Sequence, residues 1–207
     1  WDNPYWTRNQ NYETDGRGRY FGNIGLEYKL LSWLNLKGQI SLDKYNEFEE
    51  QRIADGSVAV SEYSRFDRSF EERNYDLILN SDPLKLTENL KFTFLVGSNV
   101  RKNEIYSVLD KTNGGLALPG IYALTNSVSA RNAPTEKYTR IQVNGVFAQT
   151  SFDLNSTAFL DLSIRRDHSS ALPKDNSTYY YPAASLGLIF SNWSGTNSVF
   201  SFGKFIC

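Results

Sequence analysis

The sequence is poor in the residues that build metal sites and disulfide frameworks. Its 207 residues include one cysteine and one histidine, which excludes a disulfide framework and leaves no Cys/His cluster with metal-ligand spacing. No run of about 18 apolar residues occurs, so a helical membrane span is excluded. The formal net charge of -1 gives no case for a nucleic-acid partner. Composition therefore predicts no cofactor and names no ligand.

Aromatic residues are abundant instead. The chain holds 13 Tyr, 13 Phe and 4 Trp, which suits a lectin-like β protein or a membrane β-barrel with aromatic girdles. A barrel strand needs only about 10 alternating residues, so the mean hydropathy of -0.47 does not decide between the two. The chain begins with Trp1, shows no charged-then-apolar leader and stops directly after a strand-like pattern, so we expect a fragment of a longer protein.

The clearest alternation of apolar and polar residues lies between positions 34 and 43. Its apolar set is Leu34, Leu36, Gly38, Ile40 and Leu42, and its polar set is Asn35, Lys37, Gln39, Ser41 and Asp43. A helix would scatter these residues around its axis, whereas a strand places the two sets on opposite faces. In a membrane barrel we expect Leu34, Leu36, Ile40 and Leu42 to face lipid, and Lys37, Gln39 and Asp43 to face the lumen.

Similar strands follow along the chain, joined by connections that alternate in length. Residues 1–18 are interpreted as the end of a surface loop, and the first strand is expected from about Arg19. Short connections are predicted near 30–33, 82–89, 153–156 and 191–197, and long ones near 44–64, 104–137 and 167–180. The sequence therefore predicts an all-β, antiparallel up-and-down sheet of about eight strands with all long loops at one end.

Aromatic residues at the short-turn end favour the barrel, because membrane barrels place aromatic girdles at their interfaces. They are Tyr28, Trp33, Phe190 and Trp193. A soluble antiparallel sandwich would also alternate, however, with its apolar face in a core. The residue pattern leaves both architectures open.

Several short segments together resemble one family. They are Asn3-Pro4-Tyr5-Trp6, Gly22-Asn23 with Leu26 and Tyr28, Pro119-Gly120 with Tyr122, Leu124 and Asn126-Ser127, the segment with Val143, Gly145, Phe147 and Ala148, and a late run with Arg166-Asp167, Ser169-Ser170, Leu172-Pro173, Asn176, Tyr179, Tyr181-Pro182, Ser185 and Phe190-Ser191. In this combination the chain resembles the SusC/RagA family of TonB-linked outer-membrane proteins. It departs from the family pattern at Ile164-Arg165 and after Lys204.

The resemblance implies a sector of a transmembrane β-barrel of about 22 strands. Residues 1–207 would form part of the barrel domain of a TonB-dependent receptor, with the plug domain and signal peptide encoded upstream. The implied function is TonB-energised import of an oligosaccharide or peptide across the outer membrane of a Gram-negative bacterium. The implied partners are outer-membrane lipid, a SusD-like surface lipoprotein and the TonB complex, which acts through the plug. The alternative is a soluble all-β carbohydrate-binding module, followed by an outer-membrane hydrolase.

Two groups of residues supply catalytic ingredients but not the expected arrangement. Asp167, His168 and the two following serines contain triad residues, yet neighbours at a strand end point to opposite faces, so Asp167 could not easily orient His168. The pairs Glu49-Glu50 and Glu71-Glu72 lack evidence of two carboxyl groups facing each other across a cleft. We therefore expect no enzyme.

Candidate ligand contacts are aromatic. Tyr179 and Tyr180 lie at a loop-strand junction, where rings stack on sugars or anchor at the headgroup level. We predict that both contribute to ligand binding. Charged residues on the polar faces of their strands are expected to line a wet lumen or contact a plug: Lys37, Asp43, Lys91, Arg101, Asp161 and Arg165.

Overall fold

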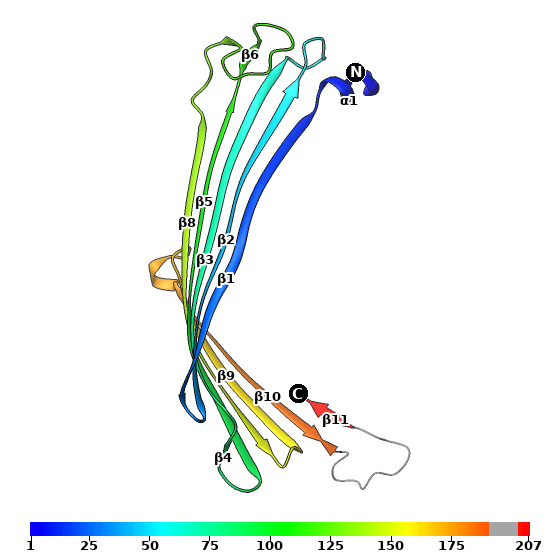
Figure 1. Ribbon diagram of the computed structural model, residues 1–207. Helices are drawn as coiled ribbons and strands as arrows, with labels where there is room; N and C mark the ends of the chain where they lie inside the picture. Colours follow the sequence, from blue (N-terminus) through cyan, green and yellow to red (C-terminus); the bar gives the residue numbers. More distant parts are fainter. Residues whose placement is uncertain (191–202) are drawn as a thin grey trace. The chain divides into compact units, whose positions relative to one another are not determined.

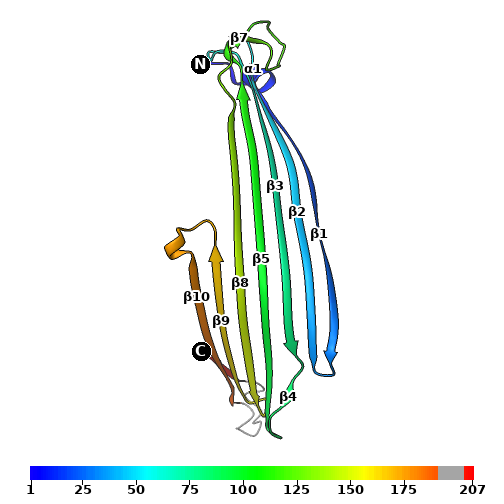
Figure 2. The same cartoon turned by 90° about the vertical axis from the view of Figure 1, so that its left-hand side faces the viewer.

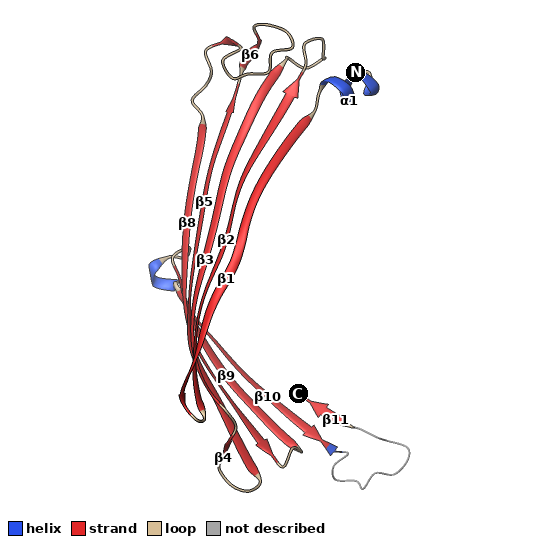
Figure 3. Cartoon of the chain, in the orientation of Figure 1, coloured by secondary structure: helices blue, strands red, loops and turns tan. Residues whose placement is uncertain are grey.

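The computed structural model describes residues 1–190 and 203–207, and they are mostly β-strand. The strands are β1 (Glu13–Leu31), β2 (Leu34–Ile53), β3 (Glu62–Ser81), β4 (Leu84–Lys85), β5 (Leu90–Lys111), β6 (Asn113–Leu116), β7 (Ser127–Ser129), β8 (Thr135–Leu154), β9 (Ala158–Ser169), β10 (Thr178–Ile189) and β11 (Lys204–Ile206). The helical elements are α1 (Pro4–Gln10) and a 3-10 turn at Lys174–Asn176 (Figure 1, Figure 3). In the described ranges no helix is long and apolar enough to cross a membrane.

The main sheet has the order β1-β2-β3-β5-β8-β9-β10-β11, with β4 beside β5. Each long strand lies next to the long strands that precede and follow it in sequence, as Figure 2 shows for β1, β2, β3, β5, β8 and β9. The pairs β8 with β9 and β9 with β10 are antiparallel, and Leu162 of β9 lies between Thr150 and Ala184. The predicted antiparallel up-and-down sheet is confirmed.

The residues divide into two compact units that share the long strands. Unit 1 comprises residues 1–22, 42–72 and 103–140, and unit 2 comprises residues 23–41, 73–102 and 141–207. Unit 1 holds helix α1 and the small sheet formed by β6 and β7. Unit 2 holds the short turns after β1 and β8 and the hairpin of β9 with β10.

Successive residues of a strand point to opposite faces, so the sheet has two faces of distinct composition. Face A is defined here as the side of β2 that carries Leu34 and Ile40, and face B as the side that carries Lys37. Side chains that contact each other across two strands lie on the same face. Contacts such as that of Lys44 with Glu71 therefore show which residues of the remaining strands belong to face A and which to face B. Face A consists of the even-numbered residues of β1, β2, β5, β8, β9 and β10 and the odd-numbered residues of β3.

In unit 2, face A is mainly apolar along the middle of every long strand. It carries Ile24, Leu26, Leu30, Leu34, Leu36, Ile40, Leu77, Leu79, Phe92, Phe94, Val96, Leu160, Leu162, Ile164, Leu186 and Leu188. No charged residue stands on face A at 24–30, 34–40, 75–79, 90–100, 146–152, 158–164 or 180–188. Many of these side chains are uncovered: Ile24 is 71% exposed and Leu26 79%.

The described strands lack a hydrophobic core. Their buried apolar residues are Ala54, Tyr63 and Leu116, and no described side chain has less than 2% of its surface exposed. The accessible surface is 14523 Å², against about 9,800 Å² for a compact protein of this mass. A sandwich would cover its apolar face with a second sheet. One layer with a bare apolar face therefore does not fit the soluble carbohydrate-binding alternative.

The two longest predicted loops are largely strand, which corrects the sequence interpretation. Positions 44–64 and 104–137 were expected to be loops, but β2 continues to Ile53, β3 begins at Glu62, β5 continues to Lys111 and β8 begins at Thr135. The connecting segments are 54–61 and 112–134, and the third long loop narrows to 170–177. In these extensions both faces of the sheet are polar, so the backbone stays extended while the alternation that identifies strands is lost.

The start of the chain also differs from its prediction as a loop. Asn3 caps helix α1, because its side chain accepts a hydrogen bond from the backbone nitrogen of Tyr5 at 2.9 Å, and Pro4 occupies the first turn. Both residues are known helix-start signals. Strand β1 then begins at Glu13, earlier than Arg19.

Short turns lie where they were predicted in the described part of the chain. The turn after β8 has Asn155 and Ser156 at positive φ values of 53° and 52°. Ring contacts in unit 2 join Trp33 to Phe94, with centroids 6.4 Å apart, and Phe92 to Phe152, at 5.2 Å. Of the other predicted girdle residues, Tyr28 and Phe190 are exposed. The predicted turn at 191–197 and Trp193 lie outside the described residues.

Candidate functional site

Face B of unit 1 carries cross-strand ion pairs between β1 and β2. Arg19 donates from Nε and Nη2 to the two carboxylate oxygens of Asp43, at 2.8 and 2.7 Å. Arg17 donates to Glu47, whose side chain is buried. A planar guanidinium that meets a carboxylate with two parallel bonds fixes its geometry. These pairs hold charged side chains in place along face B.

Two aromatic rings lie beside these ion pairs. Tyr45 of β2 and Phe70 of β3 stack with centroids 4.8 Å apart and ring planes 16° apart. The guanidinium carbon of Arg17 lies 4.9 Å from the centre of the Tyr45 ring, and that of Arg68 lies 5.8 Å from it. Both distances are within the range of cation–π attraction. We call Arg17, Tyr45, Arg68 and Phe70 the arginine–aromatic cluster.

An acidic hollow of about 510 Å³ lies on the same face of unit 1. Its walls bear the carboxylates of Glu13, Asp15 and Glu49, and its other lining residues are Thr14, Glu50, Gln51, Ser64, Phe66 and Leu109. Gln51 donates a hydrogen bond to Glu13 at 2.9 Å. Carboxylates on a concave surface favour cations and hydrogen-bond donors over anions. In the part of the chain that the structure describes, no three His, Cys, Asp or Glu side chains could hold a metal ion.

The adjacent carboxylate pairs do not face one another. Glu50 lies on face A, where it accepts a hydrogen bond from the hydroxyl of Tyr63, which lowers the pKa of the carboxyl. Glu49 lies on face B in the wall of the acidic hollow. Glu71 on face A forms an ion pair with Lys44 at 3.0 Å. Neighbouring carboxyl groups on opposite faces of a sheet cannot act on one glycosidic bond.

The triad residues are also separated by the sheet. Asp167 on face B accepts from Nε of Arg165 at 2.9 Å. His168 on face A has its Nδ1 3.2 Å from the hydroxyl oxygens of both Ser177 and Thr178. Asp167 therefore orients Arg165 and not His168, as strand alternation predicts. His168 ties the end of β9 to the start of β10.

Comparison with known proteins identifies the fold through solved structures. No protein-family model matches the chain, and no curated protein matches it. Over 98% of its length the chain is similar to a solved RagAB peptide transporter (TM-score 0.80, 14% identity). The RagAB peptide importer in an open-open state gives a TM-score of 0.84, also at 14% identity. The chain has the fold of a barrel sector of TonB-dependent transporters.

A more distant structure agrees on the architecture. The siderophore receptor PiuA from Acinetobacter baumannii is similar over 87% of this chain, with a TM-score of 0.54 and 13% identity. The chain spans 23% of the RagAB chains and 31% of the PiuA chain. At these identities the likeness establishes the fold of the sector, and the SusC/RagA resemblance remains a prediction.

The two predicted ligand-contact residues of this sector are not brought together. Tyr179 pairs with Asp167 and lies on face B, where it is 45% exposed. Tyr180 pairs with Arg166 and lies on face A, where it is 63% exposed. Tyr181 shares face B with Tyr179, because residues two apart on a strand point the same way. Tyr179 and Tyr180 therefore cannot contact one ligand from the same side of the sheet.

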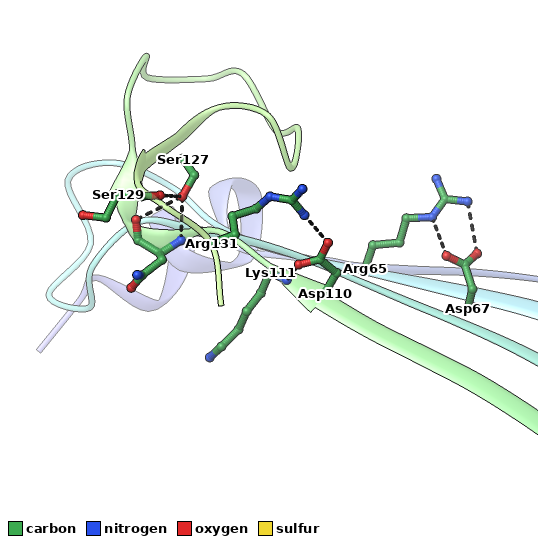
Figure 4. A network of polar contacts seen from close by, with 8 residues as sticks. Arg65, Asp67, Asp110, Lys111, Ser127, Ser129 and Arg131 are labelled. Carbon is green, nitrogen blue, oxygen red and sulfur yellow. Dashed lines mark hydrogen bonds and ion pairs between the residues drawn. The ribbon is translucent and has the colours of Figure 1, made fainter. Parts of the chain in front are cut away.

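The loop between β5 and β8 is ordered by side-chain hydrogen bonds. Asn126, which is buried, accepts from the backbone nitrogen of Leu118 at 3.0 Å and donates to the carbonyl oxygens of Leu118 and Ile121, at 2.8 and 2.7 Å. The hydroxyl of Ser127 bonds Asn113 and Ser129, and Arg131 pairs with Asp110 (Figure 4). Sequence reasoning marked Asn126-Ser127 only by family resemblance.

Sequence reasoning missed the arginine–aromatic cluster and the acidic hollow. Arg17, Tyr45 and Glu49 lie in segments that were interpreted as loops, so the alternation that places residues on one face was not applied there. Once β2 is known to continue to Ile53, the parity of Tyr45 and Glu49 places both on face B. The odd numbering of these residues within β2 was therefore the sequence signal that could have revealed the cluster and the hollow.

Proposed function

We propose that the chain is part of the wall of an outer-membrane, TonB-dependent importer, with face A of unit 2 against lipid and face B toward the lumen. The observation that carries this proposal is the composition of face A. In the middle of every long strand of unit 2 it presents a segment without a charge that is mainly apolar, and many of those side chains are uncovered. A membrane-crossing barrel strand needs about 9–11 residues; the uncharged segments 90–100 and 180–188 reach this length, and the others are shorter. Face B opposite them carries most of the polar and charged residues of these strands and suits a wet lumen.

The substrate class favoured by the comparisons is a peptide. The similar RagAB structures are described as a peptide transporter and a peptide importer. We extend that class to this protein in preference to an oligosaccharide, because the arginine–aromatic cluster and the acidic hollow offer charges of both signs to a ligand. Energy from the TonB complex would reach the ligand through a plug domain outside this chain.

A SusD-like surface lipoprotein is the proposed partner. The similar structures are named RagAB, a name that joins two components, which supports a partner protein. Unit 1 also exposes apolar side chains in and beside its loops, including Tyr5, Val58, Val60 and Leu118. Apolar groups of this kind suit a protein interface. The extracellular side is proposed for the loops 54–61, 112–134 and 170–177, because long loops of outer-membrane barrels lie on that side.

Cysteine labelling along β2 tests the membrane orientation. We expect single cysteines at 37, 39 and 43 of the intact transporter, with Cys207 replaced by serine, to react with a water-soluble thiol reagent. Cysteines at 34, 36, 40 and 42 should be protected in the membrane because they are on face A. The measurement is the labelled fraction in outer membranes and again after unfolding in detergent, where all seven positions should react. Equal labelling of even and odd positions in membranes would contradict the barrel proposal.

Tyr179 and Tyr180 stay our proposal for ligand contact, with Tyr179 as the main contributor because it is on face B. Replacing both residues with alanine should weaken uptake of the cognate nutrient about fivefold, since one stacked ring contributes about 1 kcal/mol and only the ring of Tyr179 lies on face B. The single change Tyr179→Ala should account for most of that loss. Uptake is compared at equal amounts of folded barrel in the outer membrane. If the double variant imports as fast as the wild type, neither tyrosine contacts the ligand.

A further inference from the structure

Arg68 differs from the other arginines of the arginine–aromatic cluster and its neighbouring ion pairs. Arg17 and Arg19 each have a carboxylate partner, Glu47 and Asp43 respectively. Arg68 is half-buried on face B of β3, and its Nε is inaccessible to solvent and has no hydrogen-bond partner. A buried donor without an acceptor costs about 1–3 kcal/mol, and more when it is charged. The terminal Nη groups of Arg68 have no hydrogen bond or ion pair to any described residue, so they, and not the enclosed Nε, are the donors that a ligand can reach.

The surroundings of Arg68 suit a planar anion. Its guanidinium lies over the Tyr45 ring at 5.8 Å, and that ring stacks on Phe70. An arginine held against an aromatic surface loses less side-chain freedom when it binds, and its fork of N–H donors matches the two oxygens of a carboxylate. Glu47, the carboxylate in the ion pair of Arg17, already accepts two hydrogen bonds from that arginine.

The acidic hollow indicates which charge the other end of the ligand carries. Phe66 lines that hollow and precedes Arg68 by two residues on the same face of β3, a rise of about 7 Å along the strand. A ligand that reaches Arg68 along this face also meets Glu13, Asp15 and Glu49. These carboxylates repel a ligand of net negative charge and attract a positive end. A ligand that suits both places has a negative group at Arg68 and a positive group in the hollow, which is the charge pattern of a zwitterion.

We propose that Arg68 binds the carboxylate of a zwitterionic peptide ligand, whose amino end lies in the acidic hollow. This inference rests on the proposed function, because it requires face B to line the path of an imported peptide. It assigns the orientation of the peptide and a residue that recognises one of its ends. Arg68 contacts the ligand directly and takes no part in covalent chemistry.

A double-mutant cycle between Arg68 and the peptide carboxylate tests the assignment. The intact transporter, with its lipoprotein partner, is purified as wild type and as Arg68→Gln. Each is titrated with a short peptide of neutral side chains and with the same peptide amidated at its carboxyl end. We expect Arg68→Gln to weaken binding of the free-carboxylate peptide about tenfold and binding of the amide less than about twofold, because one charge-assisted bond is lost. Arg68→Lys, which keeps the charge, should retain a preference for the carboxylate.

Arg65 provides the matched control. It stands on the same strand and carries the same charge, but it lies on face A, where Asp67 accepts from it at 2.9 and 3.1 Å (Figure 4). Arg65→Gln should leave the affinity for both peptides unchanged. Equal losses for the two peptides in Arg68→Gln, or no loss for either, would overturn the assignment. A wild-type transporter that binds and imports neither peptide would instead overturn the peptide-import function itself.

Discussion

Replacing Leu162 with arginine is expected to lower the free energy of unfolding of the intact barrel in a bilayer by about 2–4 kcal/mol. Leu162 lies near the middle of β9 on face A, between Leu160 and Ile164 on the same strand and next to Thr150 and Ala184 across it. A guanidinium there would be placed in hydrocarbon with no carboxylate near it. The measurement is reversible unfolding by denaturant in lipid vesicles.

Ser163→Arg is the matched control for this prediction. Ser163 is the next residue of β9, but it lies on face B between Asp161 and Arg165, in the proposed wet lumen. We expect a loss below about 1 kcal/mol there, because an exposed charge keeps its hydration. If Ser163→Arg were as damaging as Leu162→Arg, face A would not be the lipid surface.

The second large effect is expected at Asn126 in the loop between β5 and β8. Its carboxamide is bonded to three backbone groups of Leu118 and Ile121, and Asn126→Ala leaves those groups without a partner. We expect local opening of residues 112–134 to become about 2–3 kcal/mol easier. Amide hydrogen exchange of the intact protein should report faster exchange in this loop and unchanged exchange in β5 and β8.

Asn132 offers the comparison for the loop. It belongs to the same loop but is exposed, so Asn132→Ala should leave the exchange rates unchanged. Similar acceleration in both variants would mean that the order of the loop does not depend on the Asn126 bonds.

The strands of unit 2 could be predicted from sequence because one of their faces is apolar and the other polar. Leu34 to Leu42 shows this alternation most clearly, and the long strands of that unit were expected close to their positions, whereas the short strands β4 and β11 were not expected. The extensions of unit 1 escaped prediction because neither of their faces is apolar. Lys44 and Glu71 meet on face A, and Arg19 and Asp43 meet on face B, so the sequence there has strand geometry without a hydrophobic period.

The candidate site was less predictable than the fold, because it depends on register. Parity alone places Arg65 and Arg68 on opposite faces of β3. It does not reveal that Arg65 is paired with Asp67, or that Nε of Arg68 has no partner. Asp67 stands on the same strand as Arg65, whereas the surroundings of Arg68 depend on which residues of β2 and β5 lie opposite it. Tyr179 and Tyr180 are adjacent in sequence, and strand alternation therefore places them on opposite sides of the sheet. Closeness in sequence did not predict a shared site.

Strand β2 continues well past Leu42, where its regular alternation of apolar and polar residues ends. From Leu42 to Ile53 its contour length is about 36 Å, at about 3.3 Å per residue. The polar layer of a bilayer leaflet is only about 5–8 Å thick, so in the proposed orientation much of this strand extension has water on both sides. Antibodies, phage and proteases would then meet a broad charged flank of the transporter as well as its loops. A binder raised against Lys44, Arg65 and Asp67 could recognise living cells without touching the ligand path at all.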